Sequence, residues 1–186
     1  GAVTGRMTHQ SPNMAQVPAS YSPYGHECRS CWTVPSGKKL VGFDASGLEL
    51  RMLAHYMDDK EFTNVLLTED IHTRNQMAAG LETRPQAKTF IYAFLYGAGD
   101  AKIGTVVGGS AADGARLKQR FLANTPALAG LRERVGRAAA RGYLTGLDGR
   151  LLRVRSEHAA LNTLLQAAGA IVMKKALVLL DEYAKL

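Results

Sequence analysis

Apolar and polar residues alternate with the period of an α-helix along most of this chain, and only two short stretches follow the period of a strand. Residues 157–186 show one long helical pattern, and shorter ones cover residues 48–57, 61–67, 70–79, 101–107, 111–122 and 126–141. Residues 39–45 favour a strand, and residues 143–154 favour a hairpin whose Asp148-Gly149 turn suits type I′. Residues 1–39 are rich in Gly, Pro, Ser and Asn and predict turns and extended segments.

The most clearly delimited helix lies at residues 83–99. Thr83 is a suitable N-cap, and Gln86 stands where the reciprocal partner of a capping box stands. Pro85 falls in the first turn, where its missing N–H costs nothing. Gly97 and Gly99 follow the last apolar residues, so we expect the helix to end there.

One face of this helix carries two cations followed by two aromatic rings. Arg84, Lys88, Tyr92 and Tyr96 recur at every fourth position, which places them on one side of the helix. Phosphates suit the cations near a helix N-terminus, and sugars and bases suit the rings. The pattern predicts a nucleotide-binding face, and it equally fits an amphipathic helix with a solvated basic end and aromatic core contacts.

Composition adds a preference for a polyanionic partner. The chain has 186 residues, 46% of them hydrophobic and 21% charged, which is ordinary for a globular protein. Its formal net charge of +7 favours nucleic acid or another polyanion. No apolar run reaches the ~18 residues of a membrane span and no signal peptide is visible, so we expect no membrane partner and a cytoplasmic location.

The two cysteines, Cys28 and Cys31, stand near His26 and raise the question of a metal site. A structural zinc ion needs four ligands, usually two such pairs, and His9 is the only other candidate close by in the sequence. We therefore expect two free thiols, as in a reducing cytosol.

Asp44, at the end of the predicted strand, is the first candidate for metal chemistry. A carboxylate beside the backbone carbonyl of Ala45 is a suitable ligand pair for Mg²⁺, which proteins usually share with substrate phosphates. Phosphoryl transfer needs that metal and cations on the phosphates. An N-cap role for Asp44 and a surface position for His72 in a first helical turn remain the simpler interpretations of each residue alone.

Taken together, these stretches resemble motifs A and B of the family A (polymerase I-like) DNA polymerases. The sequence from Asp44 to Glu49, Asp-Ala-Ser-Gly-Leu-Glu, is similar to motif A, and residues 84–97 are similar to motif B. Residues 4–6, 12–18, 70–73, 147–150 and 158–169 also fit the family. The resemblance covers essentially the whole chain and is closest to the replicative polymerases of short-tailed lytic bacteriophages.

The resemblance implies a role for each matching residue in nucleotide binding. Asp44 and the Ala45 carbonyl would hold two catalytic Mg²⁺ ions. Glu49 and Tyr92 would select deoxyribose, and Lys88 would also protonate the leaving pyrophosphate. The dNTP-binding set implied by the resemblance is Ser46, Gly47, Leu48, Glu49, His72, Arg84, Lys88 and Tyr92.

It also implies contacts with primer–template DNA, largely through the minor groove, where acceptors common to all base pairs permit shape checking. Tyr96 would stack on the template side of the nascent pair. The implied DNA-binding set is Arg6, Gln16, Tyr96, Gly97, Arg150, Asn162 and Gln166.

The fold implied is α+β, a partial antiparallel palm sheet with a mostly helical fingers lobe. Residues 1–57 would form part of the palm, residues 58–144 the fingers, and residues 145–186 a palm hairpin and long helix. The family's His-Asp-Glu motif, which carries the second metal-binding carboxylate, does not occur in this sequence. We therefore expect a fragment that is inactive alone and lacks the thumb to which a processivity factor would bind.

Two other functions remain open at this stage. A single-subunit phage RNA polymerase shares the metal-binding Asp and the cationic helix, although Glu49 and Tyr92 argue against it because a sugar gate has no use when ribose is the substrate. A non-catalytic nucleic-acid-binding module would account for the basic charge without a complete metal site.

Overall fold

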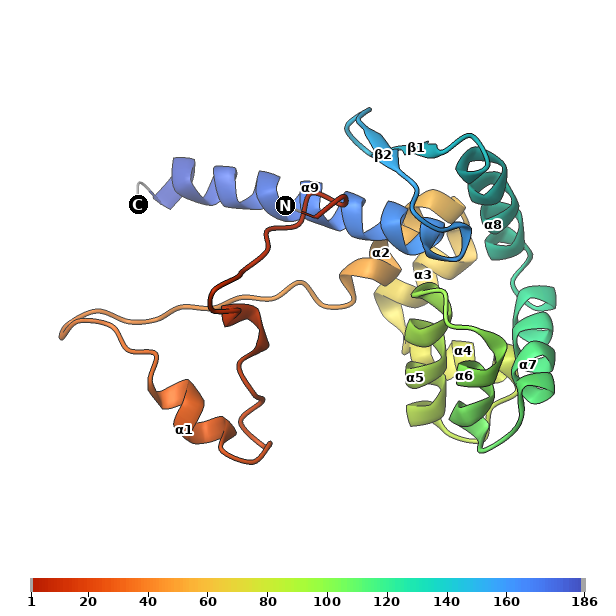
Figure 1. Cartoon of the computed structure of the whole chain (residues 1–186), viewed down its shortest axis with the longest axis horizontal. Coiled ribbons are helices and arrows are strands. Elements are labelled where there is room, and N and C mark those ends of the chain that lie inside the picture. Colours follow the sequence, from red (N-terminus) through yellow and green to blue (C-terminus); the bar gives the residue numbers. More distant parts are fainter. Residues whose placement is uncertain (1, 185–186) are drawn as a thin grey trace. The chain divides into compact units, whose positions relative to one another are not determined.

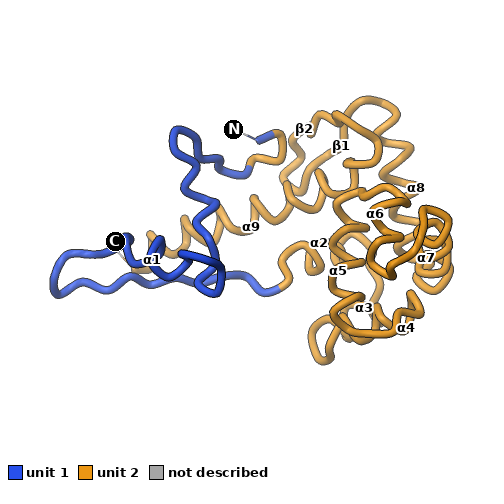
Figure 2. Tube along the Cα trace, turned by 60° about the horizontal axis from the view of Figure 1, so that its bottom comes forward, with its two compact units in different colours: residues 1–2, 6–46 blue, residues 3–5, 47–186 orange. Residues whose placement is uncertain are grey.

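A computed structural model of the chain describes residues 2–184 and divides them into two compact units (Figure 2). Unit 1 contains Ala2 and Arg6–Ser46, and unit 2 contains Val3–Gly5 and the chain from Gly47 onward. These units do not correspond to the predicted palm (residues 1–57 and 145–186) and fingers (residues 58–144), whose boundaries stay a prediction.

Unit 1 has little regular structure. It holds one turn of 3-10 helix, Met14–Gln16, capped by the Asn13 side chain, and one short helix, α1 (Gly25–Ser30). The Arg29 side chain fastens α1 to the preceding loop by donating from Nε to the Pro18 carbonyl oxygen, 2.7 Å away. Cys28 and Cys31 are free and exposed.

The strand expected at residues 39–45 does not form, and this prediction is wrong. The segment has no strand partner among the described residues, and Leu40, Val41 and Phe43 are 74%, 81% and 62% exposed. A strand is stabilised by hydrogen bonds to a neighbouring strand and by one buried face, and this segment has neither. Asp44 therefore lies in an exposed irregular segment instead of at a strand end.

Unit 2 is built almost entirely of helices (Figure 1). Its helices correspond to the predicted ones, with ends that differ by one or two residues at most sites. Helix α2 contacts α3, α8 and α9. Helix α4 contacts α5 and α7, and α6 contacts α7. The helices are α2 (Leu48–Met57), α3 (Lys60–Thr68), α4 (Ile71–Ala79), α5 (Arg84–Leu95), α6 (Asp100–Gly104), α7 (Ala111–Ala123), α8 (Pro126–Ala139) and α9 (Ala160–Ala184), with 3-10 turns at Thr105–Val107 and Glu157–Ala159.

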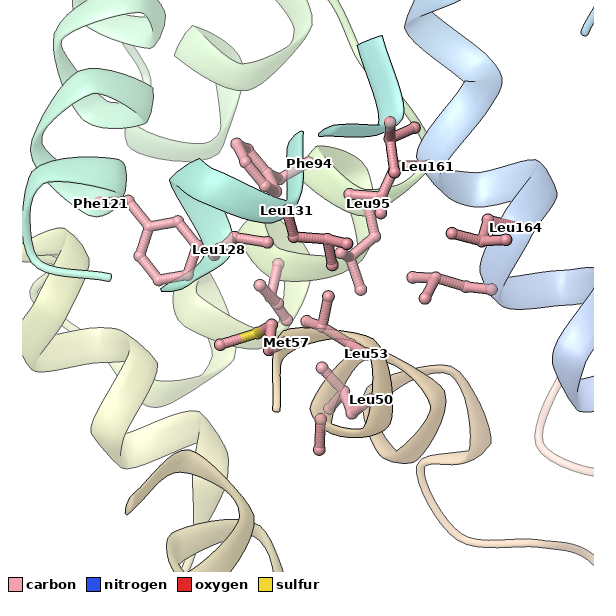
Figure 3. Close-up of a cluster of buried hydrophobic side chains, with 14 of the residues drawn as sticks. Leu50, Leu53, Met57, Phe94, Leu95, Phe121, Leu128, Leu131, Leu161 and Leu164 are labelled. Carbon is pink, nitrogen blue, oxygen red and sulfur yellow. The ribbon is translucent and has the colours of Figure 1, made fainter. Parts of the chain in front are cut away.

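The core of unit 2 lies where the apolar sides of α2, α5, α7, α8 and α9 meet (Figure 3). Phe90 on α5 is fully buried, and its ring meets that of Phe121 on α7 edge-to-face, with centroids 5.1 Å apart. Such pairs add to the free energy gained from burial of the rings alone. The core therefore fixes α5 from its buried side. The residues labelled in Figure 3 are Leu50, Leu53, Met57, Phe94, Leu95, Phe121, Leu128, Leu131, Leu161 and Leu164.

The predicted hairpin forms, with β1 (Tyr143–Thr145) antiparallel to β2 (Leu151–Arg153). Leu144 faces Leu152, and both side chains are buried. The turn is not type I′, because only Gly149 has a positive φ, +81°, whereas type I′ requires it at two central residues. The Gly146 carbonyl accepts from the Gly149 N–H (3.0 Å), which makes a three-residue loop with glycine in the left-handed region.

The last helix requires a third correction. By length and composition the segment Glu157–Ala184 is apolar enough to cross a membrane, contrary to our expectation that no segment reaches this length. A core helix of a soluble protein passes the same test. Here the buried residues of α9 lie between Ala160 and Ala170, where the helix packs on the core. Residues 185 and 186, to which the predicted helix extends, lie outside the described residues.

Candidate nucleotide-binding site

Helix α5 begins at the Thr83–Gln86 capping box and ends before Gly97, as its sequence predicts. Thr83 Oγ1 accepts from the Gln86 backbone N–H (3.3 Å), and Gln86 Oε1 accepts from the Thr83 N–H (3.1 Å), which completes the capping box. At the other end, Gly97 has a φ of +75° and the Ala98 N–H donates to the Ala93 carbonyl (2.9 Å), as in a Schellman motif. The aligned peptide dipoles of the helix give the N-terminal end of α5 a partial positive charge.

The four regularly spaced residues, three on α5 and Tyr96 as its C-cap, lie on one side of the helix, with Tyr92 packed partly against the core. Arg84, Lys88 and Tyr96 are exposed, and Tyr92 is half-buried. The ring centroids of Tyr92 and Tyr96 are 6.4 Å apart. The predicted sequence of cations followed by rings is therefore available to a ligand. The opposite side supplies the buried residues Ala87, Phe90, Ile91, Phe94 and Leu95.

Arg84 is held by Asp70, for which the sequence predicts only the role of a helix cap. Asp70, the N-cap of α4, accepts from both Nε and Nη2 of Arg84, and the Nη2 contact to Oδ1 is 3.2 Å long. The hydrogen bond from Arg84 holds the pKa of the Asp70 carboxyl well below its usual range. The only signal in the sequence is that Asp70 precedes a helix, which predicts a cap and not a partner fourteen residues away.

His72, in the first turn of α4, stands beside Tyr92. Their ring centroids are 6.1 Å apart. Burial lowers the pKa of His72, and the charges of Arg84 and Lys88 lower it further. The imidazole is therefore neutral at physiological pH, and any contact it makes with a phosphate uses its N–H group.

Glu49, in the first turn of α2, lies close enough to Tyr92 to affect its hydroxyl. Burial raises the pKa of Tyr92, and the negative charge of Glu49 raises it further. The preceding residue, Leu48, packs against Gly169 of α9, where an added Cβ would lie 3.1 Å from Leu48 Cδ2. Thus α2, α4 and α5 bring Glu49, His72 and Tyr92 near one another, and their roles in nucleotide binding stay a prediction.

A cavity of about 450 Å³ lies beyond the end of α5. The guanidinium of Arg132 lies 5.0 Å from the centre of the Phe94 ring, and Lys118 donates to the Ala98 carbonyl (2.6 Å). Both cations line the cavity together with Gly97 and His158. The ring end of the α5 face is thus followed by a partly basic cavity that our sequence analysis did not predict, because its lining residues are distant in sequence.

The residues expected to contact DNA from the hairpin and α9 also belong to unit 2. Arg150 is bound by Asp148, with Nη2 2.8 Å from Oδ2 and Nε 2.8 Å from the same oxygen. Asn162 and Gln166 are partly exposed and lie one turn apart on α9. The structure places both amides on one helix face, and their contacts with DNA stay a prediction.

The remaining predicted residues lie in unit 1 or at its end. Asp44, Ser46, Arg6 and Gln16 are exposed, and Ala45 is partly exposed. Carboxylate and carbonyl oxygens are ligands that Mg²⁺ prefers, so the donor chemistry of Asp44 and Ala45 fits the ion. In the part of the chain that the structure describes, no three His, Cys, Asp or Glu side chains form a metal-binding group. The next residue along, Gly47, opens unit 2 with a φ of +59°.

Comparison with known families identifies the chain. The model of DNA polymerase family A matches residues 1–185. The chain belongs to DNA polymerase family A. It is 50% identical to the DNA-directed DNA polymerases of Enterobacteria phage T3 and of Escherichia phage T7, each over 208 aligned residues. Each alignment covers 98% of this chain but only 30% of the phage polymerase, so the family A chain spans less than a third of the length of these relatives.

More distant relatives extend the similarity to bacteria. DNA polymerase I of Pseudomonas aeruginosa is 26% identical over 98% of the chain and 22% of its own length. Among solved structures, the POL domain of Pol1 from M. smegmatis in complex with DNA primer-template and dNTP has a TM-score of 0.81, with 22% identity over 99% of this chain and 36% of that one. At this identity the likeness shows the fold, a part of the polymerase domain.

Proposed function

We propose that this chain takes part in template-directed DNA synthesis, the transfer of a nucleotide from a dNTP to the 3′-hydroxyl of a primer, in the replication of a phage genome. The support is its membership of family A and its 50% identity to two phage DNA-directed DNA polymerases. The observation that carries the proposal is the grouping of Glu49, His72 and Tyr92 beside the exposed cations of α5. In this grouping the cations suit the phosphates of a deoxynucleoside triphosphate, and Tyr92 and Glu49 suit its sugar.

In this proposal each part of the nucleotide meets its own group on α5 and its neighbours. Arg84 and Lys88 bind the β- and γ-phosphates with help from the His72 N–H, and the N-terminus of α5 adds its partial charge. Tyr92 packs on the deoxyribose, and Glu49 fills the space that a 2′-hydroxyl would need. Lys88 also gives a proton to the leaving pyrophosphate. Ser46, Gly47 and Leu48 line the nucleotide from the turn that precedes α2.

Asp44 and the Ala45 carbonyl would hold Mg²⁺, of which family A polymerases generally use two ions. The metal, when bound, would neutralise phosphate charge and lower the pKa of the primer hydroxyl. Asp44 contributes one carboxylate to that set, and the second, in the family's His-Asp-Glu motif, is not in the sequence. We therefore propose that these 186 residues do not catalyse the reaction by themselves.

The DNA contacts complete the proposal. Tyr96 and Gly97 border the nascent base pair, while Arg6, Gln16 and Arg150 contact the primer–template duplex. Asn162 and Gln166 add contacts along its minor groove from α9. Residues 1–57 and 145–186 would belong to the palm and residues 58–144 to the fingers. The polymerase would act in the host cytoplasm, and a processivity factor would bind its thumb.

A chimaeric polymerase tests the proposal. The segment of the phage T7 polymerase that aligns with this chain is replaced by residues 1–186, and primer extension is measured with dNTPs and with rNTPs. We expect extension with dNTPs, and we expect Asp44→Ala to abolish it while primer–template binding, followed by fluorescence anisotropy, is retained. Asp58→Ala, a change of the same kind outside the site, is the matched control and should leave extension unchanged.

The outcomes separate the three functions considered. Extension with rNTPs in preference would favour an RNA polymerase, although the relatives reported above are all named DNA polymerases. DNA binding without extension by a folded chimaera would favour a non-catalytic module. Extension that survives Asp44→Ala would remove Asp44 from the metal site.

A further inference from the structure

Asp70 makes two kinds of contact with one carboxylate. Toward its own helix it accepts from the His72 backbone N–H (3.0 Å, at Oδ1) and from Thr73 Oγ1 (3.0 Å, at Oδ2), which caps α4. Toward α5 it binds Arg84 through both Nε and Nη2. The carboxylate is therefore fixed by the backbone of α4, and the long arginine side chain is the partner that is free to move.

The pair lies where a ligand can reach it. The Arg84 and Asp70 side chains are 52% and 39% exposed. A guanidinium offers the same donor edge to a carboxylate and to a phosphate, so the two anions compete for it. Lys88, one turn further along the same face, makes no ion pair within residues 2–184. One cation of the face is thus already bound to an anion, and the other is available.

We propose that Asp70 is a positioning residue that holds Arg84 while no nucleotide is bound and that the phosphates of a nucleoside triphosphate displace it. This inference rests on the proposed function, in which Arg84 binds phosphates. It adds that Arg84 exchanges one anion for another, so that Asp70 lowers the affinity for triphosphate and keeps Arg84 aligned at the N-terminus of α5 until the ligand arrives. It also ties the first turns of α4 and α5 together in the nucleotide-free chain.

Titration of the 186-residue chain with inorganic tripolyphosphate, followed by calorimetry, tests the exchange. Asp70→Asn keeps an oxygen to cap α4 and removes the competing charge. We expect it to bind tripolyphosphate about two- to fivefold more tightly, the range that one exposed ion pair covers. Asp70→Ser, a second uncharged cap, should give the same direction. Unchanged or weaker binding in both variants would overturn the proposal.

Asp113→Asn is the matched control. Asp113 also stands at a helix N-terminus and pairs with an arginine, Arg116, but on α7. This variant raises the net charge by the same amount and should leave the affinity unchanged. If it tightens binding as much as Asp70→Asn does, the effect is one of net charge and the proposal fails.

A double variant shows whether Asp70 acts through Arg84. In an Arg84→Ala background, Asp70→Asn should no longer tighten binding, and a persistent effect would contradict the exchange. The side-chain Nε–H resonance of Arg84 should shift both in Asp70→Asn and on addition of tripolyphosphate to the wild-type chain. If the wild-type chain binds no tripolyphosphate, the proposed function of α5 fails and the exchange with it. Binding that is weakened by Arg84→Ala but not tightened by Asp70→Asn overturns the exchange alone.

Discussion

The α-carbon of Gly97 faces the backbone carbonyl of His158 so closely that a Cβ atom at position 97 would lie 2.1 Å from that oxygen. Gly97 ends α5, and His158 lies in the 3-10 turn that leads into α9. Backbone packs on backbone here, so no side-chain movement can relieve the contact. The end of the nucleotide-binding helix is thereby fixed against the start of α9.

Gly97→Ala should destabilise the chain by about 2–4 kcal/mol, because it adds the strain of a positive φ to overpacking against a carbonyl. The midpoint of urea unfolding, followed by circular dichroism, measures this loss. Gly99→Ala is the control, since Gly99 has open space around its α-carbon and an ordinary φ of −66°. Equal midpoints for the two variants would show that the contact with His158 is not tight.

Glu49→Ala should relax the selection of deoxyribose. The charge of the Glu49 carboxylate raises the pKa of Tyr92, so the two side chains face the same region, and in the proposed function removal of the carboxylate opens space where a 2′-hydroxyl would stand. In the T7 chimaera, the ratio of dNTP to rNTP incorporation should fall by about 10- to 100-fold. Glu61→Ala, which removes an exposed carboxylate on α3, should leave the ratio unchanged. If Glu49→Ala keeps the original ratio, Glu49 has no part in the selection.

His72 should make the chain less stable in mild acid. Its pKa is lowered in the folded state, first by burial and then by Arg84 and Lys88, so the unfolded state binds more protons below the ordinary value of 6.5. The stability that comes from this group is complete above that value and is lost as the pH falls through the lowered pKa. Asp70 stays ionised over this range because its own pKa is far lower.

The measurement compares urea midpoints at about pH 7.5 and about pH 5 for the wild-type chain and for His72→Gln. The variant should lose less stability between the two values. His55→Gln, which replaces an exposed histidine of α2, is the control and should behave like the wild type. An identical loss in His72→Gln and the wild type would mean that His72 titrates normally in the folded chain.

The isolated chain should bind primer–template DNA weakly and extend it undetectably. Its net charge of +7 supplies an affinity that does not depend on base sequence, so binding should weaken steeply as salt is raised from about 50 to about 200 mM. Anisotropy of a labelled primer–template and a gel assay for extension measure the two properties. Robust extension by the 186 residues would show that Asp44 needs no second carboxylate from a His-Asp-Glu motif.

Local signals in the sequence were sufficient for most of unit 2. The Thr83–Gln86 capping box, the Asp70 cap and the positive φ of Gly97 all lie within a few residues of the helix ends that they define. The predicted helices and the presence of a hairpin follow from the same short-range patterns, but its register does not, because a two-residue Asp148-Gly149 loop would pair Leu144 with Arg153 instead of Leu152. The motif resemblance then indicated the family, because motifs A and B combine residue types at fixed spacings.

Two local predictions, the strand at residues 39–45 and the type I′ turn, were wrong because each depends on backbone pairing that the local residue types do not determine. Residues 39–45 have strand-forming side chains, yet no neighbouring strand among the described residues accepts their hydrogen bonds. The Asp148-Gly149 pair fits a type I′ turn, but the Gly146 N–H donates to the Arg150 carbonyl, which leaves a three-residue loop in which Asp148 keeps a negative φ. In both cases the residue types suit the predicted element, but the backbone hydrogen bonds that would complete it are not formed within the part of the chain that the structure describes.

The sequence by itself determined which residues form each helix, which side of α5 carries Arg84 and Tyr92, and to which family the motifs are similar. Only the tertiary structure decided that Asp70 binds Arg84, that the charge of Glu49 on another helix affects Tyr92, and that Gly97 cannot carry a side chain. The reason is physical. Helix periodicity and capping act within about four residues, whereas an ion pair or a backbone contact between helices depends on how their buried faces pack.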